Sequence, residues 1–339
     1  MTKIAVLGNG SWGSVLGSML ADNGHDVVFY GNIESVNNEI NEKHTNSHYM
    51  KDWKLNPSTR ATGDLEDAMT DADILLFVLP TKAVRIVAKN VRAILDKTGK
   101  KPLIVTATKG IEPGSMKLIS EILEEEVYPE DADKIVAISG PSHAENVAQK
   151  DLTAISCAST NEENAKLVQK VFSNDYVRFY TNDDLIGVEV GGAVKNVIAI
   201  AAGILVGKNY GDDAKAALMT RGLAEITRLG VNYFGAKPMT FSGLSGIGDL
   251  IVTCTSSNSR NWRAGKQIGE GEDLDTVLNN MGQVVEGATT VKAVHELAQK
   301  KNIDMPISEA IYNVLYENGD VDEEIKKMMG REPKSEINL

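Results

Sequence analysis

The sequence predicts an α/β fold: a Rossmann-type, mainly parallel sheet in the N-terminal part, followed by an all-helical C-terminal domain. Three observations support this. A glycine-rich turn follows the first apolar run, further apolar runs alternate with helical stretches, and only helical spacing follows residue 185. Strands that alternate with helices are typical of a parallel sheet covered on both faces. A length of 339 residues fits two domains, and we place them at 1–184 and 185–339.

The composition argues against several classes of protein. The net charge of −12 argues against nucleic acid as a partner. The start, MTKIAVLGNG, does not read as a signal peptide. Cys157 and Cys254 show neither a disulfide framework nor a metal-binding spacing, and the five histidines form no H-E-x-x-H pattern. We therefore expect a cytoplasmic protein without a bound metal.

The first elements carry a nucleotide-binding motif. Lys3–Leu7 is a short apolar run typical of a buried strand, and residues 14–23 have helical spacing before the strand-like Asp26–Tyr30. Between the first two lies Gly8-Asn9-Gly10-Ser11-Trp12-Gly13, a G-x-G-x-x-G. The first glycine allows the tight turn, the second lets the backbone approach a pyrophosphate, and the third lets helix and strand pack closely. This context favours dinucleotide binding over a merely structural turn.

The end of the second strand should distinguish NAD from NADP. An acid there binds the ribose hydroxyl of NAD, whereas an arginine favours the 2′-phosphate of NADP. The chain has Asn32 and Ile33 there, and Glu34 lies further along. Neither rule is met, so the preference between NADH and NADPH stays open.

Later strands of the predicted sheet end in polar groups. The apolar runs are 74–79, 103–108, 135–139 and 153–156, with helical stretches such as 82–95 and 116–126 between them. Ligands bind such sheets at the carboxyl ends of the strands. Lys109 follows one run, and Gly140-Pro141-Ser142-His143-Ala144 follows another. Taken alone, these could be a solvated lysine and an ordinary turn.

A long helix is predicted from Leu185 to Val206, and it is apolar on every side. It is long enough to span a bilayer, but charges inside it argue for a buried helix of a soluble protein. Lys195 lies near its middle. A buried lysine has a lowered pKa and can exchange a proton near neutral pH, as general acid–base catalysis requires. The alternative is a lysine whose amine reaches water along the helix side.

The helical part contains a basic stretch in an otherwise acidic protein. Gly243–Asp249 reads as a glycine-rich bend that ends in a carboxylate, and Ser259 is a good N-cap for a helix through Lys266. Helix-terminal N–H groups and the guanidinium of Arg260 could hold a small anion there. A solvated basic helix end is the alternative.

Many ordered sequence blocks together resemble the bacterial-type NAD(P)-dependent glycerol-3-phosphate dehydrogenases. The blocks are GNGSWG near residue 8, TKGIEP (108–113), SGPSHAENV (139–147), GVEVGGAVKN (187–196), GDDAKAALMTRGLAEI (211–226), FSGLSGIGDLIVTC (241–254), SRNWRAG (259–265), VVEG (284–287) and MPISEA (305–310). They cover essentially the whole chain. The resemblance implies NAD(P)H-dependent reduction of dihydroxyacetone phosphate to sn-glycerol 3-phosphate for glycerophospholipid synthesis, often by a homodimer.

The resemblance also implies roles for individual residues. Lys195 corresponds to the catalytic lysine, with Asn196 beside it. The implied substrate contacts are Lys109, Gly140, Ser142, Lys195, Asp249, Ser259, Arg260 and Asn261, with Thr253 one turn beyond Asp249. The implied cofactor contacts are Gly8, Gly10, Ser11, Trp12, Gly13, Asn32, Ile33, Tyr49, Lys109, Ala144, Arg260, Val284 and Glu286. Many relatives have an arginine at the position of Ile33, so a strong preference for NADPH is not expected.

Together these observations predict a mechanism. The phosphate would bind Arg260 and Asn261, and Lys195 would give its proton to the forming alkoxide, with Lys109 lowering and Asp249 raising the pKa of Lys195. Two other functions remain open. A 3-hydroxyacid or 6-phosphogluconate-type dehydrogenase would have an asparagine where Ala199 lies. A catalytically silent dinucleotide sensor would bind cofactor without turnover.

Overall fold

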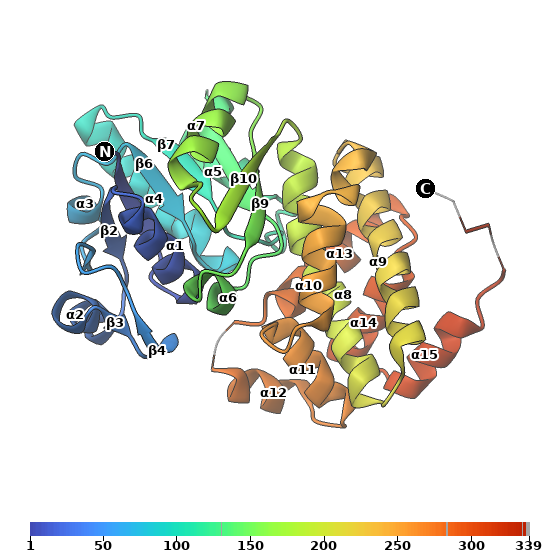
Figure 1. The fold of residues 1–339 in the computed structure, drawn as a ribbon. Helices are drawn as coiled ribbons and strands as arrows, with labels where there is room; N and C mark the ends of the chain where they lie inside the picture. The colour runs from blue at the N-terminus through green and yellow to red at the C-terminus, as the bar shows by residue number, and fades with distance from the viewer. Residues whose placement is uncertain (130, 283, 334, 337–339) are drawn as a thin grey trace. The chain divides into compact units, whose positions relative to one another are not determined.

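The computed structural model describes residues 1–129, 131–282, 284–333 and 335–336 (Figure 1). The chain forms two compact units. The first consists of Met1–Thr108 and Ile119–Leu185, and the second of Lys109–Leu118 and Ile186–Leu339. The α/β fold class with a helical C-terminal part is confirmed.

The first unit is built on an eight-stranded sheet of order β10-β9-β8-β7-β6-β1-β2-β5. Its strands are β1 (Lys3–Leu7), β2 (Asp26–Tyr30), β5 (Arg60–Thr62), β6 (Ile74–Phe77), β7 (Leu103–Thr106), β8 (Ile135–Ser139), β9 (Thr153–Ala158) and β10 (Val177–Asn182). Neighbours pair in parallel except β8 and β9, which are antiparallel. A separate hairpin joins β3 (Thr45–Asn46) to β4 (Met50–Lys54).

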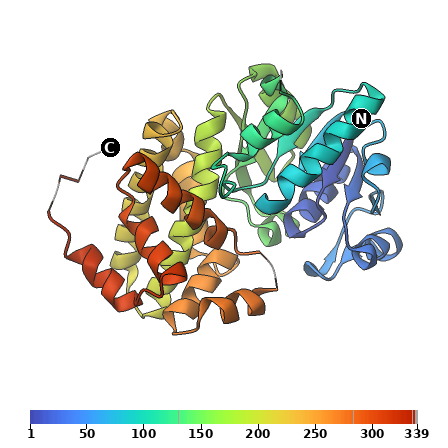
Figure 2. The same ribbon diagram turned by 180° about the vertical axis from the view of Figure 1, so that it is seen from behind.

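Helices cover both faces of this sheet, which explains why its central strands are apolar throughout. The helices are α1 (Ser11–Asp22), α2 (Glu34–Lys43), α3 (Leu65–Ala68), α4 (Thr81–Thr98), α5 (Ile119–Glu126), α6 (Ala144–Ala148) and α7 (Glu162–Phe172). Along β1, Ile4 and Val6 pack into a core with α1, whereas Ala5 and Leu7 face a second core with α4 and α5. Figure 2 shows α4 and α5 lying across this second face.

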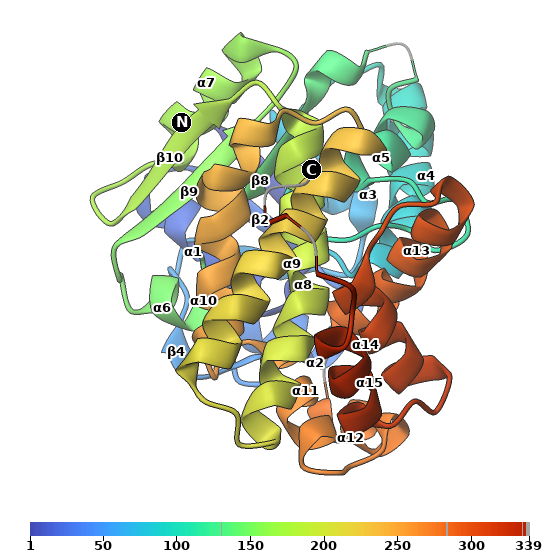
Figure 3. The ribbon, with the colours of Figure 1, turned by 90° about the vertical axis from the view of Figure 1, so that its right-hand side faces the viewer.

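In the second unit, Lys109–Leu118 contains no helix, whereas all regular elements of Ile186–Leu339 in the described residues are helical. Its α-helices are α8 (Leu185–Gly207), α9 (Asp212–Asn232), α10 (Asp249–Thr255), α11 (Arg260–Gly269), α12 (Leu274–Met281), α13 (Glu286–Lys301), α14 (Pro306–Tyr316) and α15 (Val321–Met329). Helices α9, α10, α11 and α13 contact α8 (Figure 3). In the described part of the chain, α8 alone is long and apolar enough to cross a membrane, and 83% of its apolar window is buried. It is the core of this unit.

Some predicted boundaries differ from the structure. The expected bend at Gly243–Asp249 is a π-helical turn, Leu244–Gly248, that leads into α10. Strand β10 and the β3–β4 hairpin were not predicted. The segment Lys109–Leu118 groups with the helical unit because Ile111 and Leu118, joined by an antiparallel bridge, are fully buried in its core. The domain division at residue 184 stays a prediction, and residues 337–339 of that assignment lie outside the described residues.

Candidate active site

The turn after β1 has the conformation that dinucleotide binding requires. Gly8 has a φ of +115°, which favours glycine. A Cβ on Gly13 would lie 1.9 Å from the carbonyl oxygen of Gly8, so α1 packs here only because residue 13 lacks a side chain. A Cβ on Gly10, the N-cap of α1, would meet nothing within 4 Å. The N-terminus of α1 therefore borders open space.

A buried network of asparagines supports this turn. The side-chain nitrogen of Asn9 donates to Asn37 at 2.8 Å, and that of Asn37 donates to the carbonyl oxygen of Gly31 at 2.8 Å. Asn46 in turn donates to the carbonyl oxygen of Asn9 at 2.8 Å. Sequence reasoning missed these residues. The helix that carries Asn37, α2, was not predicted either, so no sequence signal pointed to this residue.

Other candidates of the first unit lie near the starts of α1, α2 and α6. The hydroxyl of Ser11 donates to the backbone oxygen of Tyr49 at 3.2 Å, which brings two predicted cofactor contacts together. Ile33 is the N-cap of α2, and the exposed Asn32 precedes it. Ala144 begins α6. Trp12 packs against the core on the α1 face.

Gly140 and Ser142 lie directly after β8. The Ser142 hydroxyl donates to the carbonyl oxygen of Gly140 at 3.0 Å. A Cβ on Gly140 would lie 3.0 Å from the carbonyl oxygen of Ala154, so this position is tightly packed against β9. These contacts fix the loop, and the predicted roles of both residues in substrate binding stay predictions.

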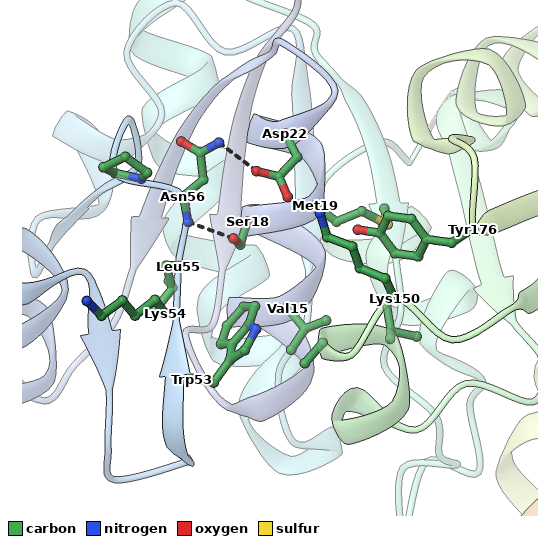
Figure 4. A pocket seen from close by; sticks show the side chains of 13 residues that line it. Val15, Ser18, Met19, Asp22, Trp53, Lys54, Leu55, Asn56, Lys150 and Tyr176 are labelled. Atoms are coloured by element: carbon green, nitrogen blue, oxygen red, sulfur yellow. Dashed lines mark hydrogen bonds between the residues drawn. The ribbon is translucent and has the colours of Figure 1, made fainter.

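A pocket of about 280 Å³ lies along the flank of α1 (Figure 4). The backbone nitrogen of Asn56 donates to Ser18 at 2.8 Å, and its side chain donates to Asp22 at 2.7 Å. These bonds tie the segment after β4 to α1. None of the predicted site residues lines the pocket.

The helical unit brings together the buried Lys195, Asp249 and Thr253 and the half-buried Lys109. Lys195 of α8 and Asp249 at the start of α10 are only 5% and 1% exposed. The ammonium of Lys195 donates to Asp249, and to Thr253 at 2.6 Å. Lys109 donates to the other carboxylate oxygen of Asp249 at 2.6 Å. These contacts exclude the alternative in which Lys195 extends into water.

The electrostatics of this cluster favour proton transfer. Burial lowers the pKa of Lys195 to about 8 and the nearby Lys109 lowers it too, while Asp249 acts in the opposite direction. Burial alone would raise the pKa of Asp249, but the two ammonium groups outweigh it and hold this pKa below its ordinary value. The aspartate therefore stays ionised, and Lys195 can give up a proton near neutral pH.

The predicted anion site lies at the N-terminus of α11. Ser259 caps this helix, and its hydroxyl accepts from the backbone nitrogen of Trp262 at 3.2 Å. Arg260 follows as the first helical residue and is exposed. Asn261 is buried instead, where its side chain donates to Asn196 at 3.0 Å and accepts from the backbone of Gly287 at 2.9 Å.

Glycines bring α11 into backbone contact with α8. A Cβ on Gly203 or Gly265 would lie 2.0 Å from a carbonyl oxygen of the other helix. One turn further along, a Cβ on Gly207 would lie 2.3 Å and a Cβ on Gly269 2.5 Å from a carbonyl oxygen of the other helix. The two helices cross without intervening side chains, so the N-terminus of α11 is held in place relative to Lys195.

Among the residues that the structure describes, no three His, Cys, Asp or Glu side chains gather as metal ligands. A Rossmann-type sheet with a dinucleotide turn, together with a helical unit that buries a lysine–aspartate cluster, defines a nicotinamide-dependent dehydrogenase. Two family models cover nearly the whole chain: the N-terminal part of NAD-dependent glycerol-3-phosphate dehydrogenase matches residues 3–165, and the C-terminal part matches residues 184–326. The chain belongs to the NAD-dependent glycerol-3-phosphate dehydrogenase family.

Individual relatives agree with this membership. The chain is 86% identical to glycerol-3-phosphate dehydrogenase [NAD(P)+] of Lactobacillus acidophilus and 85% identical to that of Lactobacillus helveticus, over the full length of both chains in each case. The crystal structure of glycerol-3-phosphate dehydrogenase from Coxiella burnetii has a TM-score of 0.91 at 36% identity, covering 97% of this chain and 99% of that one. A ketopantoate reductase from Ralstonia eutropha, at 15% identity and a TM-score of 0.61, shares the fold alone.

Proposed function

We propose that this chain reduces dihydroxyacetone phosphate to sn-glycerol 3-phosphate with NAD(P)H, and that Lys195 is its general acid. Family membership supports the reaction, and it decides against the 3-hydroxyacid and 6-phosphogluconate types. The observation that carries the role of Lys195 is its buried ammonium, bonded to Asp249 and Thr253, with a pKa lowered to about 8.

The proposed cofactor contacts fit a dinucleotide. The glycine turn and the N-terminus of α1 would hold the pyrophosphate, since Gly10 leaves open space there. Ser11, Trp12 and Tyr49 belong to the same proposal, as do the other cofactor contacts that the resemblance implies. When bound, the reduced nicotinamide supplies a hydride to the carbonyl carbon.

The chain's own residues supply the proton and the charge. Lys195 donates a proton to the carbonyl oxygen as negative charge develops on it. Lys109 adds a second positive charge beside that oxygen, and each such contact is worth about 3–4 kcal/mol by the scale of a lost oxyanion donor. Asp249 holds both ammonium groups in place. The phosphate would bind the N-terminal N–H groups of α11 and the guanidinium of Arg260.

A substrate and cofactor panel tests this function. The purified chain is assayed for oxidation of NADH and of NADPH with dihydroxyacetone phosphate, and with 3-hydroxyacids or 6-phosphogluconate plus the oxidised cofactors in parallel. We expect turnover with dihydroxyacetone phosphate and none in the parallel reactions. Cofactor binding without turnover would favour the dinucleotide sensor instead.

Three further proposals concern the location, the oligomeric state and the metabolic role of the enzyme. We infer a cytoplasmic location, because the one candidate membrane helix among the described residues is the buried core helix α8. We also infer a homodimer, which light scattering during size exclusion would test. We further infer that the product, sn-glycerol 3-phosphate, supplies glycerophospholipid synthesis. Cells that lose the activity should then require added glycerol 3-phosphate.

A further inference from the structure

Helix α13 does not cap its own N-terminus. Its N-cap residue is Val285, whose side chain has no oxygen to accept from the N–H groups of the first turn. The side-chain oxygen of Asn261, on α11, accepts from the backbone nitrogen of Gly287 at 2.9 Å instead. The cap of α13 is therefore supplied by a residue that the resemblance places in the substrate site.

The nitrogen of the same side-chain amide binds α8, the helix that carries Lys195. The side-chain nitrogen of Asn261 donates at 3.0 Å to the side-chain oxygen of Asn196, the neighbour of Lys195 on α8. Asn196 and Asn261 are 6% and 8% exposed. A Cβ on Gly287 would lie 2.5 Å from the carbonyl oxygen of Asn196, so the first turn of α13 also touches the backbone of α8. One side chain thus joins three helices.

These two hydrogen bonds use most of the side-chain capacity of Asn261. One proton of its side-chain nitrogen is the only side-chain donor not accounted for by the two contacts. Its backbone N–H, in the first turn of α11, belongs to the groups proposed to hold the phosphate. By contrast, its position is well suited to hold the start of α13, where Val284 and Glu286 are proposed to contact the cofactor.

We propose that Asn261 is a positioning residue that acts through α13: it caps the first turn of that helix and so fixes Val284 and Glu286 relative to Lys195. This rests on the proposed cofactor contacts of Val284 and Glu286. It predicts that Asn261 affects cofactor affinity in the absence of substrate, which a phosphate ligand would not do.

Two single variants separate the cap from a substrate contact. Asn261→Ala removes the acceptor for Gly287, whereas Asn261→Asp retains an acceptor there. In the binary complex we expect Asn261→Ala to raise the Kd for NADH about tenfold, the scale of a lost helix cap, and Asn261→Asp to stay within about twofold of the parent. Titration of the NADH fluorescence measures both. Hydrogen exchange of the first turn of α13 should be faster only in Asn261→Ala.

A rescue variant tests the mechanism directly. Val285→Thr is close to isosteric and gives α13 an N-cap hydroxyl of its own. Combined with Asn261→Ala, it should restore slow exchange in this turn and bring the NADH affinity back to within about threefold of the parent. It also keeps the test decisive if Asn261→Ala alone does not fold.

The matched control removes an equivalent cap elsewhere in the same unit. Glu225, on α9, accepts from the backbone nitrogens of Ile307 and Ser308 at the start of α14. Glu225→Ala should lower the melting temperature and speed exchange in α14 without changing the NADH Kd. If it weakens NADH as much as Asn261→Ala does, the effect is general loosening and the proposal is wrong.

Glu286→Ala distinguishes failure of the inference from failure of the cofactor assignment. If Glu286→Ala weakens NADH binding but Asn261→Ala does not, the positioning role is refuted and the assignment stands. If neither variant changes the NADH Kd, the cofactor contact at Glu286 is itself wrong and the inference falls with it. Equal weakening by Asn261→Asp and Asn261→Ala would also overturn the capping role.

Discussion

Replacing Asp249 by asparagine would remove the negative charge that Lys109 and Lys195 share. The carboxylate is 1% exposed and binds both ammonium groups, with Lys109 at 2.6 Å. It is the group that raises the pKa of Lys195 against burial and against Lys109. Without it, the two largest remaining influences, burial and Lys109, both lower the pKa of Lys195. The pKa of Lys195 should therefore fall below its present value of about 8.

The size of the fall in the pKa of Lys195 follows from the negative charge that Asp249→Asn removes. Two unit charges about 4 Å apart interact with roughly 4 kcal/mol at an effective dielectric constant near 20. One pKa unit corresponds to about 1.4 kcal/mol, so this interaction corresponds to a pKa shift of about three units. Relaxation around the new side chain reduces the shift. We expect a downward shift of about one to three units.

The assay is the pH dependence of kcat for reduction of dihydroxyacetone phosphate. Because Lys195 must be protonated to act as the acid, the rate of the parent should fall as the pH rises through about 8. In Asp249→Asn this fall should occur at a lower pH. Thr253→Val, which removes a neutral partner of the same ammonium, is the matched control and should shift the profile less. A profile that does not move, or that moves upward, would refute the proposed coupling.

Four further changes have defined outcomes. Lys195→Ala should reduce turnover by more than about a hundredfold while the NADH Kd stays near that of the parent, and activity within tenfold of the parent would reject Lys195 as the acid. Arg260→Ala should raise the KM for dihydroxyacetone phosphate steeply, and an unchanged KM would remove it from the phosphate site. Ile33→Arg should shift the ratio of kcat/KM values toward NADPH, which steady-state rates with both cofactors measure. Burial raises the pKa of Glu225 from 4.5 to about 7, so the folded state should lose stability as the pH rises from about 4.5 to 7; denaturant unfolding of Glu225→Gln should lack this slope.

Much of the fold could be predicted because its signals are local. The run IAVL and the glycine turn after it predicted β1 and the start of α1 within a few residues. The signal for β4, MKDWK, is weak because most of its side chains are exposed. Strand β10 is an edge strand whose alternating burial is short and mixed with polar residues. The π-helical turn before Asp249 could not be predicted from glycine content, which indicates a bend equally well.

The reactive residues of the candidate site were easier to predict than the residues that hold them in place. Lys195 could be identified because it is a charged residue near the middle of an apolar helix, and the structure buries it as expected. Its partners Lys109 and Asp249 are separated by 140 residues, so only the family resemblance brought them together in the sequence. The cap that Asn261 gives to α13 spans 26 residues and has no local pattern. The absence of an oxygen on Val285 becomes informative only once the start of α13 is known.

The glycine crossing of α8 and α11 limits how this unit can move and change. Each helix rests directly on the peptide groups of the other, so no rotamer change can absorb a displacement between them. Slow fluctuations and rearrangements must then occur in other segments, while Lys195 and the N-terminus of α11 move together as a rigid body. Even a single methyl group introduced at Gly203 would separate the two helices, and with them Lys195 and the proposed phosphate site.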